Sequence, residues 1–148
     1  MNKIAKLLRG TTRLPDSGAA VRRVGQRIEV RFRNGRKQMV RIWHRGDRYE
    51  LSSTVIGKRR ADEHEWEDLA ERLWGRNRET DVVGFGLDGE GGIGGKIEQL
   101  AQTLDREELV YYLDRLAFEC NRLEYIMTGR NIRYNCWVYR ALQKSKST

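Results

Sequence analysis

Six residues, Gly84-Phe85-Gly86-Leu87-Asp88-Gly89, have the spacing GxGxxG, which cradles a pyrophosphate in dinucleotide-binding proteins. That chemistry requires the last glycine to open a helix, whose N-terminal amides hold the phosphates. Here another glycine-rich turn follows, as far as Gly95. A P-loop is also excluded, because Lys96 is followed by Ile97 rather than by Ser or Thr. We therefore predict a hairpin at this position, and no cofactor.

The histidines and cysteines do not have the spacing of a metal or catalytic site either. His64-Glu65-Trp66-Glu67-Asp68 begins like a zinc-protease helix, but Asp68 stands where the second histidine is needed. Cys120 and Cys136 do not form a CxxC pair, so we expect free thiols rather than a disulfide or a zinc site. The sequence therefore predicts no catalytic residue, no metal ion and no enzymatic activity.

Charge is distributed unevenly along the 148 residues, whose net charge is +8. Residues 1–60 hold 17 Lys and Arg against 4 Asp and Glu, whereas residues 61–148 hold 12 against 17. This division indicates an acidic partner for the N-terminal half, or contact with the acidic half of a second copy. No apolar run reaches the length of a membrane span and no signal peptide is evident, so we expect a cytoplasmic protein without a membrane partner.

The clearest helix pattern runs from Asp105 to Gly129. Asp105 and Glu108 have the spacing of a capping box, and Gly129 can adopt the left-handed conformation that ends a helix. Steps of three and four residues predict one buried stripe, which consists of Leu109, Leu113, Leu116, Cys120, Leu123 and Met127 and is widened by Tyr112, Ala117 and Ile126.

A second helix is expected from about Asp62 to Gly75. Asp62 and Glu65 repeat the capping-box spacing at its start. Its predicted buried face consists of Trp66, Leu69, Ala70, Leu73 and Trp74.

Alternating apolar residues predict strands around Ile28, over 38–43 and over 48–55, and another at 82–87. A three-residue loop over 34–36 would pair Val30 with Val40 and keep the apolar residues on one face, so we predict an odd-length loop. Residues 96–104 fit either a strand paired with 82–87 or the start of a helix, and both alternatives remain open. The order is strand-strand-strand-helix-strand-strand-helix.

The first predicted hairpin carries a basic face that could bind RNA or DNA, because arginines contact phosphates and an aromatic ring stacks on a base. The alternative is a solvated sheet face or a dimer face. A tight turn at Arg45-Gly46 would place Arg41 between Glu29 and Glu50, which favours that alternative because the arginine is then partly neutralised. The candidate nucleic-acid face consists of Arg31, Arg33, Arg36, Lys37, Arg41 and Trp43.

Two segments resemble the YbjN-like relatives of the type III secretion chaperones (CesT type). They are Gly46-Asp-Arg-Tyr-Glu-Leu-Ser-Ser53 and the stretch from Leu104-Asp105 to Asn121-Arg-Leu-Glu124 and Thr128-Gly129, and the likeness covers about residues 22–130. Asn121 stands where those relatives commonly have aspartate, which puts a transferred contact at that position in doubt.

The resemblance implies an α+β fold with a twisted antiparallel sheet of about five strands, in the order βββ-α-ββ-α, and helices packed mainly on one face. It also implies a dimer that holds an extended client segment, for which sheet edges and neighbouring apolar pockets are suited. We expect a flexible basic segment at 1–20, one chaperone-like domain at 21–129 and a basic tail at 130–148.

The sequence thus predicts a non-enzymatic protein-binding module whose partner is a client protein or a second copy. The alternative function is nucleic-acid binding by the basic N-terminal half. Candidate residues of the dimer or client interface are Phe85, Tyr111, Tyr112, Arg115, Phe118 and Arg122.

Overall fold

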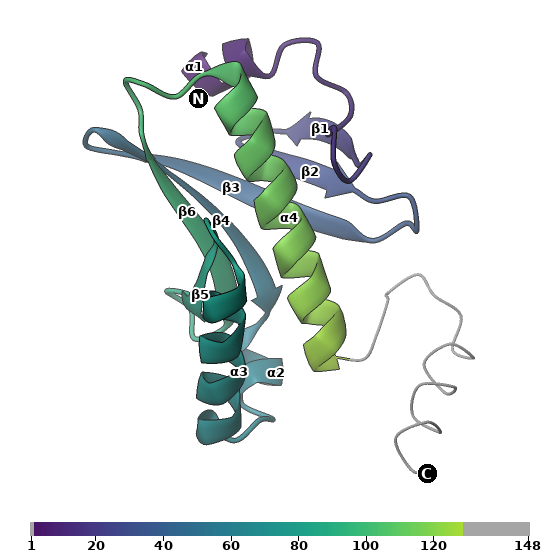
Figure 1. Cartoon of the computed structure of the whole chain (residues 1–148), viewed down its shortest axis with the longest axis vertical. Coiled ribbons are helices and arrows are strands. Elements are labelled where there is room, and N and C mark those ends of the chain that lie inside the picture. The colour runs from purple at the N-terminus through teal and green to yellow at the C-terminus, as the bar shows by residue number, and fades with distance from the viewer. Residues whose placement is uncertain (1, 129–148) are drawn as a thin grey trace.

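The computed structural model describes residues 2–128 (Figure 1). They form a six-stranded antiparallel sheet and four helices, so the α+β class is confirmed with six strands rather than about five. The predicted tail at 130–148, Gly129 and Cys136 lie outside the described residues. The elements are α1 (Asn2–Leu7), β1 (Ala20–Val24), β2 (Arg27–Arg31), β3 (Lys37–Arg45), β4 (Arg48–Ile56), α2 (Lys58–Ala61), α3 (Trp66–Glu79), β5 (Gly84–Leu87), β6 (Ile93–Leu100) and α4 (Arg106–Thr128).

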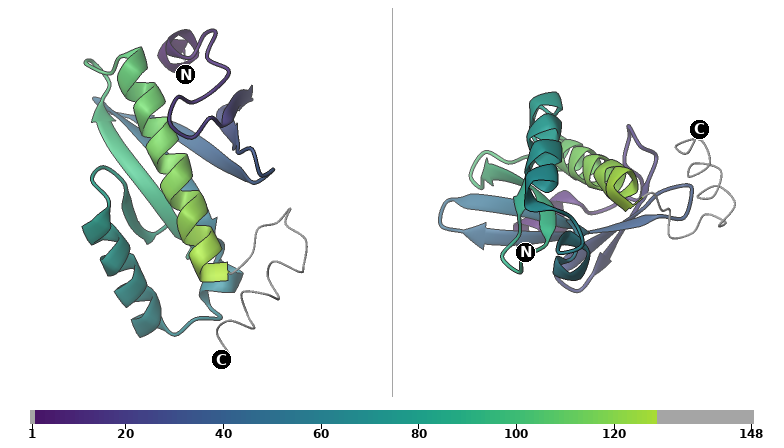
Figure 2. Two further views of the ribbon diagram at one scale, coloured as in Figure 1. Left: turned by 45° about the vertical axis from the view of Figure 1, so that its right-hand side comes forward. Right: turned by 90° about the horizontal axis from the view of Figure 1, so that it is seen from below.

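The strands are ordered β1-β2-β3-β4-β6-β5 across the sheet. Helix α4 crosses one face and contacts β3, β4 and β6, while α3 packs beside β5 at the sheet's edge (Figure 2). Because β6 spans Ile93–Leu100, the open alternatives at 96–104 resolve to a strand up to Leu100, and a turn follows at 101–103. The predicted hairpin reading of the GxGxxG segment is confirmed, since β5 pairs antiparallel with β6.

Helix α4 supplies much of the core, as its sequence pattern predicts. All six residues of the predicted stripe are buried, and each buried leucine contributes about 1.5–3 kcal/mol relative to exposure. At the N-terminus, Glu108 N–H donates to Asp105 Oδ1 at 2.8 Å, which is the first half of the expected capping box. Ile126 is 44% exposed, so its predicted place in the buried stripe is wrong.

A glycine in β6 lets α4 approach the sheet closely. A Cβ atom at Gly95 would lie 2.5 Å from the Cys120 sulfur and 3.1 Å from the Phe85 ring, distances that the packed core cannot accommodate. Cys120 is a free, buried thiol, and burial raises its pKa to about 12. This position is therefore a packing contact of the core.

The register between β2 and β3 differs from the prediction by two residues. Val30 lies opposite Gln38, not Val40. The loop length is odd as predicted, because Phe32 N–H donates to Arg36 O at 2.8 Å and leaves three residues between them. Gln38 can occupy the core face because its amide accepts from the Ser53 hydroxyl and donates to a carboxylate of α4, each at 2.8 Å.

The β3–β4 turn also lies later than predicted, with Arg45 opposite Arg48. Because both registers differ from the prediction, Arg41 lies opposite Ser52 of β4 and opposite Arg27 of β2. The prediction that Arg41 is flanked by two glutamates is wrong, and the neutralisation inferred from it does not apply.

The helix predicted from about Asp62 to Gly75 begins four residues later and ends four residues later, as α3, and a separate short helix precedes it. Helix α2 ends at Ala61, and α3 begins at Trp66 without a side-chain cap. Trp66 and Trp74 are 58% and 62% exposed, which corrects the predicted buried face. Ala70 is exposed as well. Leu69 and Leu73 are buried as predicted, and Arg76 is buried beside them.

Residues 2–19, which belong to the segment 1–20 expected to be flexible, pack onto the domain. Ile4 and Leu14 are buried at 0% and 1% exposure, and Leu8 at 5%. Residues 12–14 run beside β1, a strand that the sequence pattern did not separate from β2. The apolar residues of this segment therefore belong to the core.

Candidate interaction surfaces

Within residues 2–128, no group of three or more His, Cys, Asp or Glu side chains is arranged to hold a metal ion. In the same part of the chain no helix is long and apolar enough to cross a membrane.

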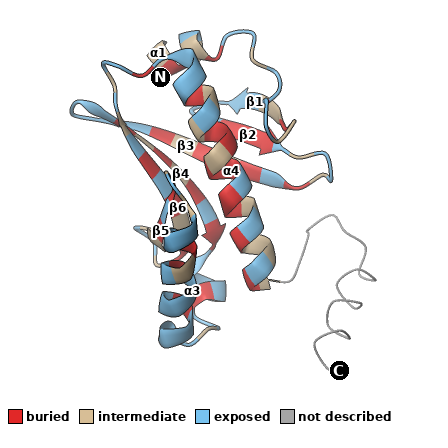
Figure 3. Ribbon diagram, viewed as in Figure 1, coloured by how far each residue is buried: buried red, intermediate tan, exposed pale blue. Residues whose placement is uncertain are grey.

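The solvent side of α4 carries an apolar stripe with arginines between its members. Exposed positions recur along the length of α4 (Figure 3). Tyr111, Phe118 and Ile126 are 42%, 40% and 44% exposed, and their spacing places them on one helix face. Arg115 lies beside Phe118, with its guanidinium carbon 5.8 Å from the ring centroid. Arg122 is exposed on the same face. We call this set the α4 stripe.

Four of the six residues predicted for a dimer or client interface are thus brought together on the α4 stripe. Tyr112 lies beside it, half-buried, and its ring meets that of Tyr111 edge to face at 5.7 Å. Burial and the neighbouring Glu108 carboxylate raise the pKa of Tyr112. Phe85 is 7% exposed and packs in the core, so the structure does not place it on this surface.

A buried ion-pair network holds α4 against α3. The Glu119 carboxylate is 4% exposed and accepts from Arg76 of α3 and, at 2.8 Å, from Arg115 of its own helix. Arg76 also pairs with Glu79 at 2.6 Å. Because Arg115 is tied to the network, the position of the α4 stripe is coupled to that of α3.

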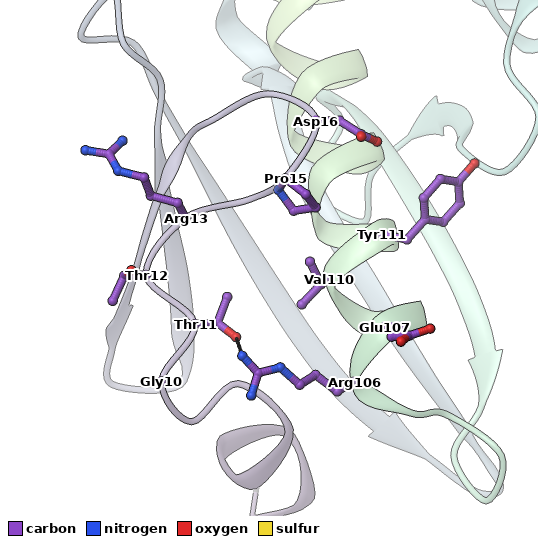
Figure 4. A pocket seen from close by; sticks show the side chains of 10 residues that line it. All are labelled: Gly10, Thr11, Thr12, Arg13, Pro15, Asp16, Arg106, Glu107, Val110 and Tyr111. Atoms are coloured by element: carbon purple, nitrogen blue, oxygen red, sulfur yellow. Dashed lines mark hydrogen bonds between the residues drawn. The ribbon is translucent and has the colours of Figure 1, made fainter.

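A groove lies between the N-terminal segment and the first turns of α4 (Figure 4). Its volume is about 450 Å³, and it is lined by Gly10, Thr11, Thr12, Arg13, Pro15, Asp16, Arg106, Glu107, Val110 and Tyr111. Arg106 closes one end by donating to Thr11 Oγ1 at 2.8 Å and to Arg9 O at 3.0 Å. Since Tyr111 belongs to both features, the groove continues the α4 stripe.

The wall of this groove is anchored by a buried carboxylate. Asp114, 1% exposed, accepts from the backbone N–H of Asp16 at 2.7 Å and of Ser17 at 3.2 Å, and from the Ser17 hydroxyl. Sequence reasoning missed this site. The available signal was an aspartate within the apolar pattern of a helix, where a charge requires buried donors.

Both edges of the sheet have hydrogen-bond partners. At β5, Asn77 of α3 accepts from Phe85 N–H at 2.7 Å and donates to Phe85 O at 3.0 Å. At β1, Val21 N–H donates to Thr12 O at 2.9 Å. These contacts occupy backbone groups that an added client strand would need. Few backbone groups at these positions are therefore left to pair with a client strand.

The residues predicted for nucleic-acid binding are divided between two sides of the sheet. Arg31, Lys37, Arg41 and Trp43 alternate onto the face opposite α4, whereas Arg33 lies in the loop after β2. Arg36 is 4% exposed, pairs with Glu124 at 3.0 Å and lies 6.0 Å from the Tyr125 ring. Arg36 is therefore part of the contact between sheet and helix, outside any exposed basic face.

The Glu124 carboxylate belongs to the same contact. Burial raises its pKa, and the Arg36 guanidinium and the Gln38 amide oppose that shift. Its two oxygens accept from these two side chains, so α4 is fixed to β3 by polar contacts as well as by apolar packing.

No protein-family model and no curated protein matches the sequence. Among solved structures, a chain of the ExsC–ExsE complex is 19% identical, with 85% of this chain and 94% of that chain covered and a TM-score of 0.51. YbjN of E. coli, solved as a candidate transcription regulator, is 12% identical over 86% and 88%, with a TM-score of 0.50. A chain of the HopA1–SchA chaperone–effector complex is 15% identical over 86% of each chain, with a TM-score of 0.43. The first two of these structures confirm the predicted resemblance at the level of the fold.

Proposed function

We propose that the protein is a non-enzymatic protein-binding module of the chaperone or adaptor type, which holds a segment of a client protein and acts as a homodimer. The observation that carries this proposal is the α4 stripe. Tyr111, Phe118 and Ile126 expose 40–44% of their surface above a core that is already filled. When a second chain covers large apolar side chains that are grouped on one face, their removal from water favours the association.

The arginines of the α4 stripe suit the same role. Arg115 and Arg122 interrupt the apolar residues with donors that carboxylates or carbonyl oxygens of a partner can accept. Aromatic residues and arginine are also the residue types that contribute most at protein interfaces. The ExsC–ExsE complex supports the proposal, because a chain of similar fold is there in complex with another protein.

The dimer is tested with Tyr111→Ala combined with Phe118→Ala, measured by size-exclusion chromatography with light scattering at micromolar concentration. We expect a folded monomer, because two side chains at the centre of the stripe are truncated. The matched control is Trp66→Ala combined with Trp74→Ala, which removes two aromatic rings from α3 that are more exposed than those of the α4 stripe. If the first variant remains dimeric, or only the control dissociates, the α4 stripe is not the dimer interface.

The client is tested by purifying the tagged protein from its native cells, with and without nuclease, followed by mass spectrometry. A defined protein partner that survives nuclease and moderate salt supports the proposal. Bound RNA or DNA that leaves as salt rises supports the alternative, nucleic-acid binding, because displaced counterions drive that association.

A further inference from the structure

The sheet face opposite α4, which we call the outer face, is strongly basic. Gln38 and Ser53 lie on the helix side, so the residues that alternate with them lie on the outer face. Its cations are Arg22, Arg27, Arg31, Lys37, Arg41, Arg45, Arg48 and Lys96, and its carboxylates are Glu29, Glu50 and Glu98. The outer face therefore carries an excess of five positive charges.

Cations on this face lie directly opposite one another in three places. The cross-strand pairs are Arg27 with Arg41, Arg31 with Lys37, and Arg45 with Arg48. Like charges directly opposite each other in an antiparallel sheet are destabilising. The arrangement therefore lowers the stability of the free protein, and an anionic partner would relieve the repulsion.

The carboxylates of the outer face are already engaged by other cations. Glu29 pairs with Arg22 and Arg31, both at 3.3 Å. Glu50 pairs with Arg45 at 3.8 Å, and Glu98 pairs with Lys96 at 3.3 Å. Within residues 2–128, Arg27 and Arg41 form no ion pair, which leaves this pair available to a partner.

Apolar side chains lie among these cations. Trp43, Leu100 and Val24 are 45%, 42% and 41% exposed on the outer face. The guanidinium of Arg45 lies 5.8 Å from the Trp43 ring. The outer face thus offers apolar contact next to positive charge.

We propose that the outer face binds an acidic, partly apolar segment of a partner protein, with carboxylates over the Arg27–Arg41 pair and an apolar side chain on Trp43. This inference rests on the proposed function and names the chemistry of its client. Glu50 and Glu98 lie opposite each other beside Trp43. A nucleic acid with a base stacked on Trp43 would bring its phosphates close to these carboxylates, whereas a polypeptide can place its charges individually.

The test is fluorescence titration of the full chain with a labelled peptide of alternating Glu and Leu residues. The variant is Arg27→Gln combined with Arg41→Gln. The matched control, Arg9→Gln combined with Arg72→Gln, removes two exposed arginines outside the outer face. We expect the first variant to weaken peptide binding by about tenfold or more and the control by less than about twofold. The first variant should also melt no lower than the wild type, because the repulsion is removed.

Equal weakening in both variants, or a variant that binds the peptide like the wild type, overturns the inference. Tighter binding of a single-stranded oligonucleotide of equal charge, lost in the first variant, overturns it in favour of a nucleic acid. The same variant is then tested against the client protein recovered from native cells. Undiminished client binding refutes the inference and leaves the proposed function intact, whereas the recovery of no protein partner refutes the proposed function itself.

Discussion

Replacing Asp114 by alanine should release the N-terminal segment from α4 while the rest of the domain stays folded. The Asp114 carboxylate is 1% exposed and accepts from two backbone amides and one hydroxyl of the turn at 16–17. Alanine provides no acceptor, so all three donors must find water or remain unsatisfied. Asp16 is exposed in the native turn, so its amide reaches water once the turn opens.

The cost follows from these three contacts. A hydrogen bond to a charged acceptor contributes about 1.5–3 kcal/mol net, and water recovers part of that when the turn detaches. We estimate that the substitution makes attachment of the N-terminal segment less favourable by about 3 kcal/mol. This raises the population of the detached segment by about 100-fold. Apolar burial of Ile4 and Leu14 remains as a partial restraint.

Amide hydrogen exchange measures this release directly. Leu14 N–H donates to Ala19 O at 2.8 Å and Val21 N–H to Thr12 O at 2.9 Å, so both amides should exchange about 100-fold faster in the Asp114→Ala variant. Amides in the second half of α4 should change much less. The matched control is Asp105→Ala, which removes an exposed helix cap on the same helix and costs about 1 kcal/mol.

The control should leave the exchange of the Leu14 and Val21 amides close to the wild-type rates. If these two amides also exchange at wild-type rates in the Asp114→Ala variant, the carboxylate does not anchor the segment. The wall of the groove would then depend on the remaining contacts of the segment, which include buried Leu14 and the hydrogen bonds from Arg106.

Three further changes test the interior. Gly95→Ala should lower the free energy of unfolding by about 1–3 kcal/mol in a denaturant titration, and Cys120→Ala should partly rescue it; an unchanged midpoint would contradict the contact. In a Cys136→Ser background, Cys120 should react with a thiol reagent no faster than the protein unfolds at neutral pH, because its pKa is about 12; rapid labelling would exclude its burial. Arg76→Met should cost about 2 kcal/mol, since Glu119 keeps one partner, and a neutral result would show that the pair adds no stability.

The sequence predicts α4 well because apolar periodicity and burial agree there. The six residues that define the predicted stripe are buried, and Asp105 caps the helix, although Ile126 at the margin of the stripe is exposed. Asp114 lies next to that stripe, and its carboxylate can be buried because donors of the N-terminal segment satisfy it. These donors come from a segment about 97 positions earlier in the chain. Contacts of that separation leave no local pattern, so the groove was not predictable from the helix alone.

Two predictions fail because a polar side chain is buried. They are the register between β2 and β3 and the buried face of α3. Hydrophobic matching pairs Val30 with Val40, yet the sheet places Gln38 there because Ser53 and Glu124 satisfy its amide. Likewise, α3 buries Arg76 against α4 in place of its tryptophans. A pattern of apolar residues cannot anticipate a polar residue whose partners lie on another element.

The sequence predicts only part of the candidate interaction surface, because local spacing reveals an exposed residue but not a distant polar partner. Tyr111 and Phe118 lie off the apolar stripe of α4, and that spacing alone places them on the solvent side. The sequence predicts Arg36 on an exposed basic face, but its partner Glu124 lies 88 positions later in the chain. Local sequence could not distinguish a solvated arginine from one that anchors a helix.

The side chain of Asn77 satisfies the backbone of Phe85 at the edge strand β5. Its amide both donates and accepts, so one side chain imitates the backbone of a missing neighbour strand at Phe85. Slow hydrolysis of that amide to a carboxylate would keep the acceptor and lose the donor, and a negative charge would then face the Phe85 carbonyl oxygen. Deamidation of Asn77 would thereby uncover the backbone of β5 at Phe85. An unpaired strand edge can pair with another chain, so the protein could begin to self-associate as it is stored, without any mutation.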